Sequence, residues 1–252
     1  MLFFDPMVTG DENFYSALQK IDWYYMDDKE EYQYAKQFIK NTDKVLDVGA
    51  GKGAFANIIS TKQYVGLDLS IGAKELAEIN GITIENESIQ EHANKFPKEY
   101  DVVCSFQVLE HVSDPYSFIK AQQNALKYGG LLIIAVPSED SFLKYVVNGV
   151  LNMPPHHVTR WSDQSLHYIE TLFELKLINL NHEKLQEVHK KSYFSTFIQS
   201  LFLKPTIVDD SIIRRLVSKI AYIITVLIEK KVPSELLPYG HTVVAVYKKV
   251  KL

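Results

Sequence analysis

Short apolar runs and helix-like stretches alternate between residues 41 and 183. In several stretches apolar residues recur at three- and four-residue spacing, which is the pattern of one helix face. These stretches predict helices near 52–60, 71–80, 115–127 and 162–173. The apolar runs between them predict strands near 44–48, 63–68, 82–85, 100–105 and 130–136. Because strands alternate with helices, we predict an α/β fold with a mostly parallel sheet.

Two more apolar runs, near 175–183 and 241–248, predict a sixth strand and a last strand. The span between them, roughly 184–240, carries apolar stripes at helical spacing over 193–202 and 212–228. The second stripe is too short to cross a bilayer. We predict a helical insertion whose apolar faces pack within the protein. The alternatives are a cover over a substrate pocket, or an apolar surface for a partner, a lipid carrier or a membrane surface.

Aromatic residues are frequent in the 1–40 segment, which precedes the first predicted strand. Those at helical spacing are Phe14, Tyr15, Tyr34 and Phe38, and Trp23, Tyr24 and Tyr25 lie between them. We predict a helical N-terminal segment that packs on the sheet. A second interpretation, in which the segment is a lid whose aromatics line a substrate mouth, stays open.

The composition is that of an ordinary globular protein with one sizeable core. Hydrophobic residues are 46% and charged residues 23% of the 252 residues. The net charge of −4 and the pI of about 6.1 argue against a nucleic-acid partner. Cys104 is the single cysteine and cannot form an internal disulfide, and residues 1–6 show no signal-peptide pattern. We therefore expect a single domain in a reducing cytoplasm.

A glycine-rich turn follows the first predicted strand, in the sequence Gly49-Ala50-Gly51-Lys52-Gly53. Glycines let the backbone approach a ligand without an intervening Cβ atom. Asp68 ends the second predicted strand, where a carboxylate accepts hydrogen bonds from ribose hydroxyls. The pattern predicts an adenosine-containing cofactor. No Gly-Lys-Ser/Thr closes the turn, which excludes a Walker-type phosphate loop, but the spacing also satisfies a nicotinamide fingerprint.

Later segments discriminate between these cofactors. The fourth strand runs into Glu110-His111-Val112, and Lys127-Tyr128-Gly129-Gly130 leads into the fifth strand. In this order the motifs resemble those of class I S-adenosylmethionine-dependent methyltransferases. They are most similar to the branch that methylates small molecules, quinones and glycans, and a nicotinamide oxidoreductase lacks both later blocks. The resemblance covers roughly 41–183 and returns at 240–248. It implies a Rossmann-like, seven-stranded sheet with helices on both faces and an antiparallel last strand, in one domain over 1–252.

The resemblance also implies roles for single residues. Asp68 would accept hydrogen bonds from the ribose hydroxyls, and Asp47 would bind the ammonium end of the cofactor through water. The sequence 85–90 departs from the family's usual Asp-Ala or Asp-Ile form, so the adenine-edge contacts rest on position alone. The other implied contacts are Gly49, Gly51 and Gly53 along the methionine portion, Leu69 on the adenine face, Ser88 and Ile89 at the adenine edge, and Phe106 and Gln107 beside the methionine moiety.

A metal site is a further hypothesis for Glu110-His111. Ubiquinone-pathway O-methyltransferases and Hen-type RNA 2′-O-methyltransferases carry Glu-x-x-Glu-His here, and a later histidine completes their divalent-metal site. In this chain Gln107 replaces the first glutamate, and an amide is a poorer ligand than a carboxylate for a hard cation. We therefore expect no metal. The alternative role of Glu110 and His111 is to cap and orient the following helix.

The loop after the fifth strand contains Pro154-Pro155-His156-His157-Val158-Thr159-Arg160-Trp161. It resembles a segment of bacterial methyltransferases related to polysaccharide modification. Histidine accepts a proton near neutral pH, so His156 or His157, with His111, is a candidate general base for a hydroxyl acceptor. The alternative is a rigid proline turn whose histidines bond to the backbone.

These motifs favour an S-adenosylmethionine-dependent methyltransferase that acts on oxygen or nitrogen of a small molecule or glycan intermediate. The alternative is a cofactor-binding, non-catalytic subunit of a partner or membrane complex, which the apolar stripes in 184–240 would suit. We divide the chain into the 1–40 lid, the 41–183 cofactor-binding core, the 184–240 insertion, and the 241–252 final strand and tail. The acceptor and the oligomeric state stay open.

Overall fold

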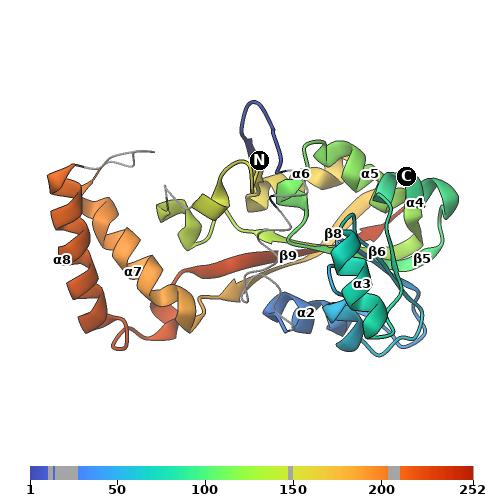
Figure 1. The fold of residues 1–252 in the computed structure, drawn as a ribbon, viewed down its shortest axis with the longest axis horizontal. Coiled ribbons are helices and arrows are strands. Elements are labelled where there is room, and N and C mark those ends of the chain that lie inside the picture. Colours follow the sequence, from blue (N-terminus) through green and yellow to red (C-terminus); the bar gives the residue numbers. More distant parts are fainter. Residues whose placement is uncertain (11–13, 15–27, 147–149, 204–210, 252) are drawn as a thin grey trace.

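The structure is a computed structural model of the 252-residue chain, and it describes residues 1–10, 14, 28–146, 150–203 and 211–251 (Figure 1). Most of the aromatic cluster predicted to pack on the sheet, including Tyr15 and Trp23 to Tyr25, lies outside the described residues. Helix α2 (Glu30–Ala35) is the part of the predicted N-terminal helical segment that can be placed against the sheet.

One seven-stranded sheet runs through the molecule in the order β4-β3-β2-β5-β6-β9-β8. Strand β9 pairs antiparallel with β6 and β8, while β2 to β6 pair in parallel. The predicted fold class is therefore confirmed. The strands are β2 (Val45–Val48), β3 (Tyr64–Leu67), β4 (Ile84–Glu85), β5 (Tyr100–Phe106), β6 (Leu126–Pro137), β8 (Leu175–Lys184) and β9 (Tyr239–Lys249).

Helices cover both faces of this sheet, as Figure 1 shows. On one face, α4 (Ile89–Lys95), α5 (Pro115–Ala125) and α6 (Asp163–Leu172) pack on a core that includes Ile134. On the other, α2 and the short 3₁₀ helix η2 (Ala54–Asn57) pack on a core that includes Ile133. Adjacent residues of β6 thus enter opposite cores, as the two-residue period of a strand requires.

Two helices near the glycine turn differ from the sequence prediction. The helix predicted over 52–60 is only the 3₁₀ segment η2, because Gly53 has a φ of 76° and the chain cannot turn helical before Ala54. Helix α4 was not predicted. Its signal was present in the sequence, because Ser88 and Glu91 form a capping box at its first turn.

Helices α7 (Glu187–Phe202) and α8 (Ile212–Ile228) form a hairpin at one end of the long axis, away from the helices that cover the sheet (Figure 1). They lie where the two apolar stripes predicted helices. The prediction that both faces pack within the protein is wrong for α8, whose Ile212 and Ile223 are 77% and 60% exposed. No helix in the described ranges is long and apolar enough to cross a membrane.

A second, two-stranded sheet joins the start of the chain to the proline-rich loop. Strand β1 (Leu2–Phe3) pairs antiparallel with β7 (Thr159–Arg160). The loop itself lies against the 3₁₀ helix η3 (Leu109–His111), because the backbone N–H of Val158 donates to the carbonyl oxygen of Glu110 at 2.9 Å. These contacts bring three distant parts of the sequence together beside the sheet.

Candidate functional site

A cavity of about 1790 Å³ opens where the carboxyl ends of β2, β3 and β5 meet. Ligands bind at this edge in open α/β sheets, because the loops that leave the strands diverge there. The glycine turn and Asp68 line one part of the wall, and His111, His156 and His157 line another. One cavity therefore joins the residues predicted for the cofactor to those predicted for the acceptor.

Two glycines of the turn, Gly49 and Gly51, line the cavity without a side chain, whereas Gly53 is not among the lining residues. Gly49, Gly51 and Gly53 have φ values of 79°, 53° and 76°, a region that side-chain-bearing residues rarely adopt. A Cβ atom on Gly49 would lie 2.3 Å from Cγ2 of Val108. The turn is therefore a cradle in which a ligand contacts main chain, as the methionine portion of the predicted cofactor requires.

Asp68 is held rigidly at the cavity by two backbone N–H groups. Gly51 donates to its Oδ2 and Ser70 donates to its Oδ1, each at 2.8 Å. Burial raises the pKa of this carboxyl, and the two hydrogen bonds oppose that rise. Beside it, Leu69 is 71% exposed although it lines the cavity. A fixed carboxylate next to an uncovered apolar side chain fits a ribose and an adenine ring.

The adenine-edge and methionine positions also line the cavity. Ser88 and Ile89 form the start of α4, and the Ser88 hydroxyl bonds Glu91 Oε2 at 2.7 Å within the capping box. Phe106 ends β5, and Gln107 follows it with a φ of 57°. Gln107 Nε2 donates to Glu31 Oε1 at 3.4 Å and Thr242 Oγ1 at 3.3 Å.

Asp47 is placed differently from the other predicted cofactor residues. It is 2% exposed, and it is absent from the residues that line the cavity. The Tyr64 hydroxyl donates to its Oδ2 at 2.8 Å, and burial raises its pKa to about 7. The structure does not bring this carboxylate to the cavity wall, so its contact with the cofactor ammonium group stays a prediction.

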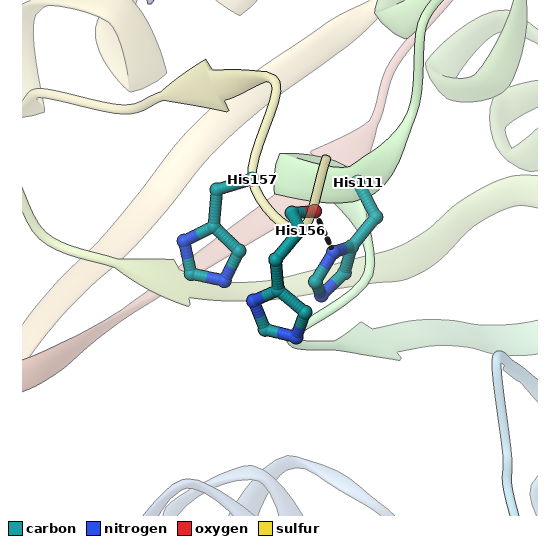
Figure 2. A group of neighbouring side chains, drawn as sticks. All are labelled: His111, His156 and His157. Carbon is teal, nitrogen blue, oxygen red and sulfur yellow. Dashed lines mark hydrogen bonds between the residues drawn. The ribbon is translucent and has the colours of Figure 1, made fainter. Parts of the chain in front are cut away.

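Three histidines cluster at the acceptor part of the wall (Figure 2). The ring centroids of His156 and His157 are 4.6 Å apart and stacked, and the His111 ring lies 4.6 Å and 4.9 Å from them. Each ring offers a nitrogen, and these atoms all lie within 4.8 Å of one another. His111 comes from η3, and the other two come from the proline-rich loop.

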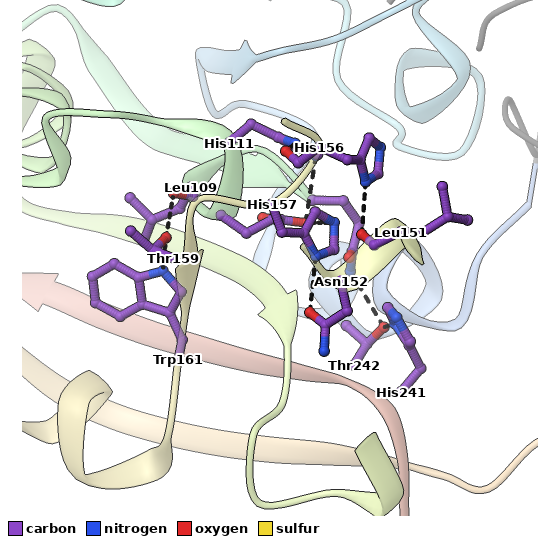
Figure 3. A network of polar contacts seen from close by, with 12 residues as sticks. Leu109, His111, Leu151, Asn152, His156, His157, Thr159, Trp161, His241 and Thr242 are labelled. Carbon is purple, nitrogen blue, oxygen red and sulfur yellow. Dashed lines mark hydrogen bonds and ion pairs between the residues drawn. The ribbon is translucent and has the colours of Figure 1, made fainter. Parts of the chain in front are cut away.

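Hydrogen bonds fix the orientation and the tautomer of each ring (Figure 3). Nδ1 of His111 donates to the His156 carbonyl oxygen at 2.6 Å, and Nδ1 of His156 donates to the Leu151 carbonyl oxygen at 2.8 Å. Nδ1 of His157 bonds Asn152 Oδ1 at 3.1 Å. In the neutral rings Nε2 then carries the lone pair. The predicted backbone bonding and the predicted basic role are thus compatible, because they use different nitrogens.

Glu110 lies behind this cluster as a buried carboxyl. Its Oε1 is 3.8 Å from His111 Nε2 and 3.9 Å from His157 Nε2, and neither of its oxygens accepts a hydrogen bond within the described residues. Burial raises the pKa of Glu110 to about 8. Burial also lowers the pKa of His111 to about 4 and of His157 to about 2, and lowers that of His156. The cluster is therefore neutral near pH 7.

The same geometry bears on the metal hypothesis. Three imidazoles with a nearby carboxylate form a donor set that suits zinc or iron better than magnesium. The expectation of no metal rests on Gln107, whose amide is engaged with Glu31 and Thr242. That expectation stays a prediction.

Sequence reasoning missed several polar residues of the cavity. Glu31 is buried on α2, and Glu183 at the end of β8 has a pKa raised by burial to about 7. His241 in β9, whose pKa burial lowers to about 4, lies beside them in the wall. Glu183 and His241 sit near strand ends, which is a usable signal. Glu31 gave no such signal, because it directly follows Glu30, and two adjacent acidic residues are typical of the solvent-exposed first turn of a helix.

Comparison with known proteins identifies the family of this chain. Residues 22–191 match a family described as a methyltransferase domain. The ubiquinone biosynthesis O-methyltransferase of Klebsiella pneumoniae strain 342 is 30% identical over 171 residues, which are 58% of this chain and 69% of that protein.

Solved structures share the fold. A S-adenosylmethionine-dependent methyltransferase from Archaeoglobus fulgidus aligns with a TM-score of 0.60 at 17% identity, covering 95% of this chain and 100% of its own. Coclaurine N-methyltransferase bound to N-methylheliamine and S-adenosylhomocysteine aligns with a TM-score of 0.55 at 14% identity, covering 98% and 76%. The chain belongs to the class I S-adenosylmethionine-dependent methyltransferases, and S-adenosylmethionine is its cofactor.

Proposed function

We propose that the enzyme methylates a hydroxyl oxygen of a small molecule or glycan intermediate. One observation carries the proposal: the cofactor cradle and a cluster of neutral histidines line the same cavity. A hydroxyl acceptor must lose its proton during transfer, which requires a base, whereas a neutral amine attacks without one. The matched relative from Klebsiella pneumoniae is named as an O-methyltransferase, which supports the same choice.

The cofactor part of the cavity supplies binding and alignment. Asp68 would hold the ribose hydroxyls, Leu69 and Ile89 would cover the adenine ring, and the turn from Gly49 to Gly53 would lie along the methionine portion. When bound, S-adenosylmethionine supplies a methyl group on a positively charged sulfur. Since the donor is already activated, the chain's own contribution is to fix the direction of approach and to exclude water.

The acceptor part would supply the base. Because Nδ1 of each histidine is committed to an oxygen, Nε2 is the atom that can take the hydroxyl proton. The imidazolium that forms lies close to Glu110, with 3.8 Å between Glu110 Oε1 and His111 Nε2. Because Glu110 is protonated near pH 7, it would stabilise that positive charge only after its own proton is released to solvent, a loss that the neighbouring imidazolium favours by lowering the pKa of Glu110.

The test is product identity combined with histidine replacement. The enzyme is incubated with S-adenosylmethionine and with matched catechol, sugar and amine acceptors, and the products are identified by mass spectrometry. We expect O-methylated product from a hydroxyl acceptor. In His111→Gln, His156→Gln and His157→Gln, turnover of that acceptor should fall by about a hundredfold or more in at least one variant, with cofactor affinity retained.

The matched control is His167→Gln, because His167 has a side chain 60% exposed on α6 and is not among the cavity-lining residues. N-methylated product alone, or wild-type turnover in all three cluster variants, would contradict the proposal. Cofactor binding without turnover of any acceptor would favour the alternative of a non-catalytic subunit.

A further inference from the structure

Helix α8 presents a wide apolar face that the rest of the chain does not cover. We call this the outer face of α8, and it consists of Ile212, Ile213, Leu216, Ile220, Ile223, Ile224 and Leu227. All seven are more than a third exposed, and at 3.6 residues per turn they form one continuous stripe along the helix. An exposed apolar surface of this size marks an interaction site.

Contacts with α7 hold the outer face outward. Ala221 and Thr225 are fully buried on the opposite side of α8. Ser218 Oγ donates to Gln199 Oε1 at 2.9 Å, and Lys191 Nζ lies 3.8 Å from Glu229 Oε1. Helix α8 therefore uses its small, inner side against α7, and the apolar stripe cannot also turn inward.

Helix α7 is in turn fixed to the body of the protein. The ring centroids of Tyr145 and Phe197 are 5.3 Å apart, and those of Phe142 and His189 are 5.4 Å apart. Phe142 belongs to a small core cluster with Leu143 and Leu185, and the last two also line the cavity. Figure 1 shows the consequence, a hairpin that projects along the long axis with α8 outermost.

The charge of the hairpin is opposite to that of the chain as a whole. Residues 187–231 contain eight Lys and Arg against four Asp and Glu, a net charge of +4, whereas the whole chain carries −4. On the helical period Arg215 and Lys219 lie one turn apart along one side of the outer face. An apolar stripe bordered by basic side chains is typical of helices that lie in a membrane interface.

We propose that the outer face of α8 docks the enzyme on the surface of an anionic lipid bilayer. Such a surface provides both acyl chains for the isoleucines and negative charge for Arg215 and Lys219. A second copy of this chain fits less well, because a twofold interface through this face would bring two net-positive hairpins together. The helix lies on the bilayer rather than across it, since none of the described helices can span one.

Docking would also orient the catalytic cavity. Helix α7 begins at the cavity wall, where Glu187, Val188 and His189 are lining residues, and Val188 is 74% exposed. The hairpin therefore connects the bilayer surface to the cavity mouth. This favours an acceptor that carries an apolar tail or lipid anchor. The statement about the acceptor rests on the proposed function, whereas the docking of α8 on a bilayer does not.

The experiment is co-sedimentation of the full chain with vesicles, either of phosphatidylcholine alone or of equal parts phosphatidylcholine and phosphatidylglycerol. We expect binding to the mixed vesicles, weaker binding to the neutral ones, and loss of the difference in high salt. Ile223→Glu should weaken binding by about tenfold or more, and Lys219→Glu by about tenfold. The matched control is Ile79→Glu on α3 (Ile71–Ile79), which replaces an isoleucine that is 81% exposed far from the hairpin.

Three outcomes would overturn the proposal. They are absence of binding to either vesicle, unchanged binding in Ile223→Glu, and equal loss in Ile79→Glu. Light scattering tests a fourth outcome that would overturn the proposal. If the wild-type chain is a dimer and Ile223→Glu is a monomer, the outer face of α8 binds a second copy of this chain. A cofactor-induced thermal shift, measured for each variant, shows that the variant is folded. Because this shift reports cofactor binding and not membrane binding, a negative vesicle result would leave the methyltransferase assignment unchanged.

Discussion

The cofactor part of the cavity and the acceptor part are built in opposite ways. At the cofactor part, one continuous segment and one strand end supply backbone groups and a carboxylate that backbone N–H groups hold. At the acceptor part, side chains from η3, the proline-rich loop, β8 and β9 meet, and most are buried titratable groups. The difference suggests that the first part tolerates little change, whereas the second can be altered to suit another acceptor.

The largest effect is expected in the glycine turn. Gly49→Ala would force a side chain into a φ of 79° and place its Cβ 2.3 Å from Val108 Cγ2. We expect a loss of about 2–4 kcal/mol in the free energy of unfolding, from backbone strain plus overpacking. Urea unfolding measures this loss. Gly129→Ala is the control for strain alone, because its φ is 81° and nothing lies within 4 Å of the added Cβ. Equal effects in both variants would mean that the contact with Val108 is unimportant.

A smaller effect is expected for the carboxylate that the turn holds. Asp68→Ala should weaken S-adenosylmethionine binding by roughly 1.5–3 kcal/mol, because hydrogen bonds to a charged group are lost. Calorimetry on Asp68→Ala and on Asp68→Asn separates charge from hydrogen bonding. Affinity equal to wild type in Asp68→Ala would remove the ribose assignment.

The acceptor part should be visible in the pH dependence of stability. The folded-state pKa of Glu110 is raised from 4.5 to about 8, so its contribution is full below pH 4.5 and is lost as pH rises through 8. Above about pH 7.5, one unit beyond the ordinary histidine pKa of 6.5, the histidines are almost wholly neutral in both states and add little slope, so the window from about pH 7.5 to 8.5 isolates Glu110. We expect the free energy of unfolding to fall across this window, by up to about 1.4 kcal/mol per pH unit for each proton lost.

Glu110→Gln tests the origin of that slope. It removes the titrating group with little change in size, so the free energy of unfolding should depend less on pH between about 7.5 and 8.5 than in wild type. Urea unfolding at closely spaced pH values, without cofactor, provides the measurement. An identical slope in both proteins would place the titration in other buried groups, such as Asp47 or Glu183, whose pKa values are raised to about 7.

The smallest effect is expected from metal removal. Because Gln107 stands where metal-dependent relatives carry a carboxylate, we expect turnover to survive prolonged treatment with a chelator. Elemental analysis of the purified enzyme and turnover before and after the chelator provide the check. Loss of activity that zinc or magnesium restores would show that the three histidines hold a metal after all.

Helix boundaries illustrate how far local sequence reasoning reaches. Ser162 and Asp114 cap α6 and α5 because their side chains accept from the backbone N–H three residues later, and both starts were predicted. The capping box of Ser88 and Glu91 uses the same chemistry and begins α4, a helix that the apolar pattern alone does not predict. The opposite holds at 52–60, where the apolar pattern predicts a helix but the left-handed conformation of Gly53 prevents one from starting before Ala54.

The alternating α/β fold, the glycine cradle with Asp68 and the cofactor class follow from the order of residues along the chain. These depend on strand period, turn conformation and chain order, which are local properties. Packing in three dimensions sets the rest: Asp47 lies outside the cavity wall, Glu31, Glu183 and His241 join it, and the apolar stripe of α8 stays uncovered. Those outcomes depend on which segments meet in space, because burial and pKa shifts arise from neighbours that are distant along the chain.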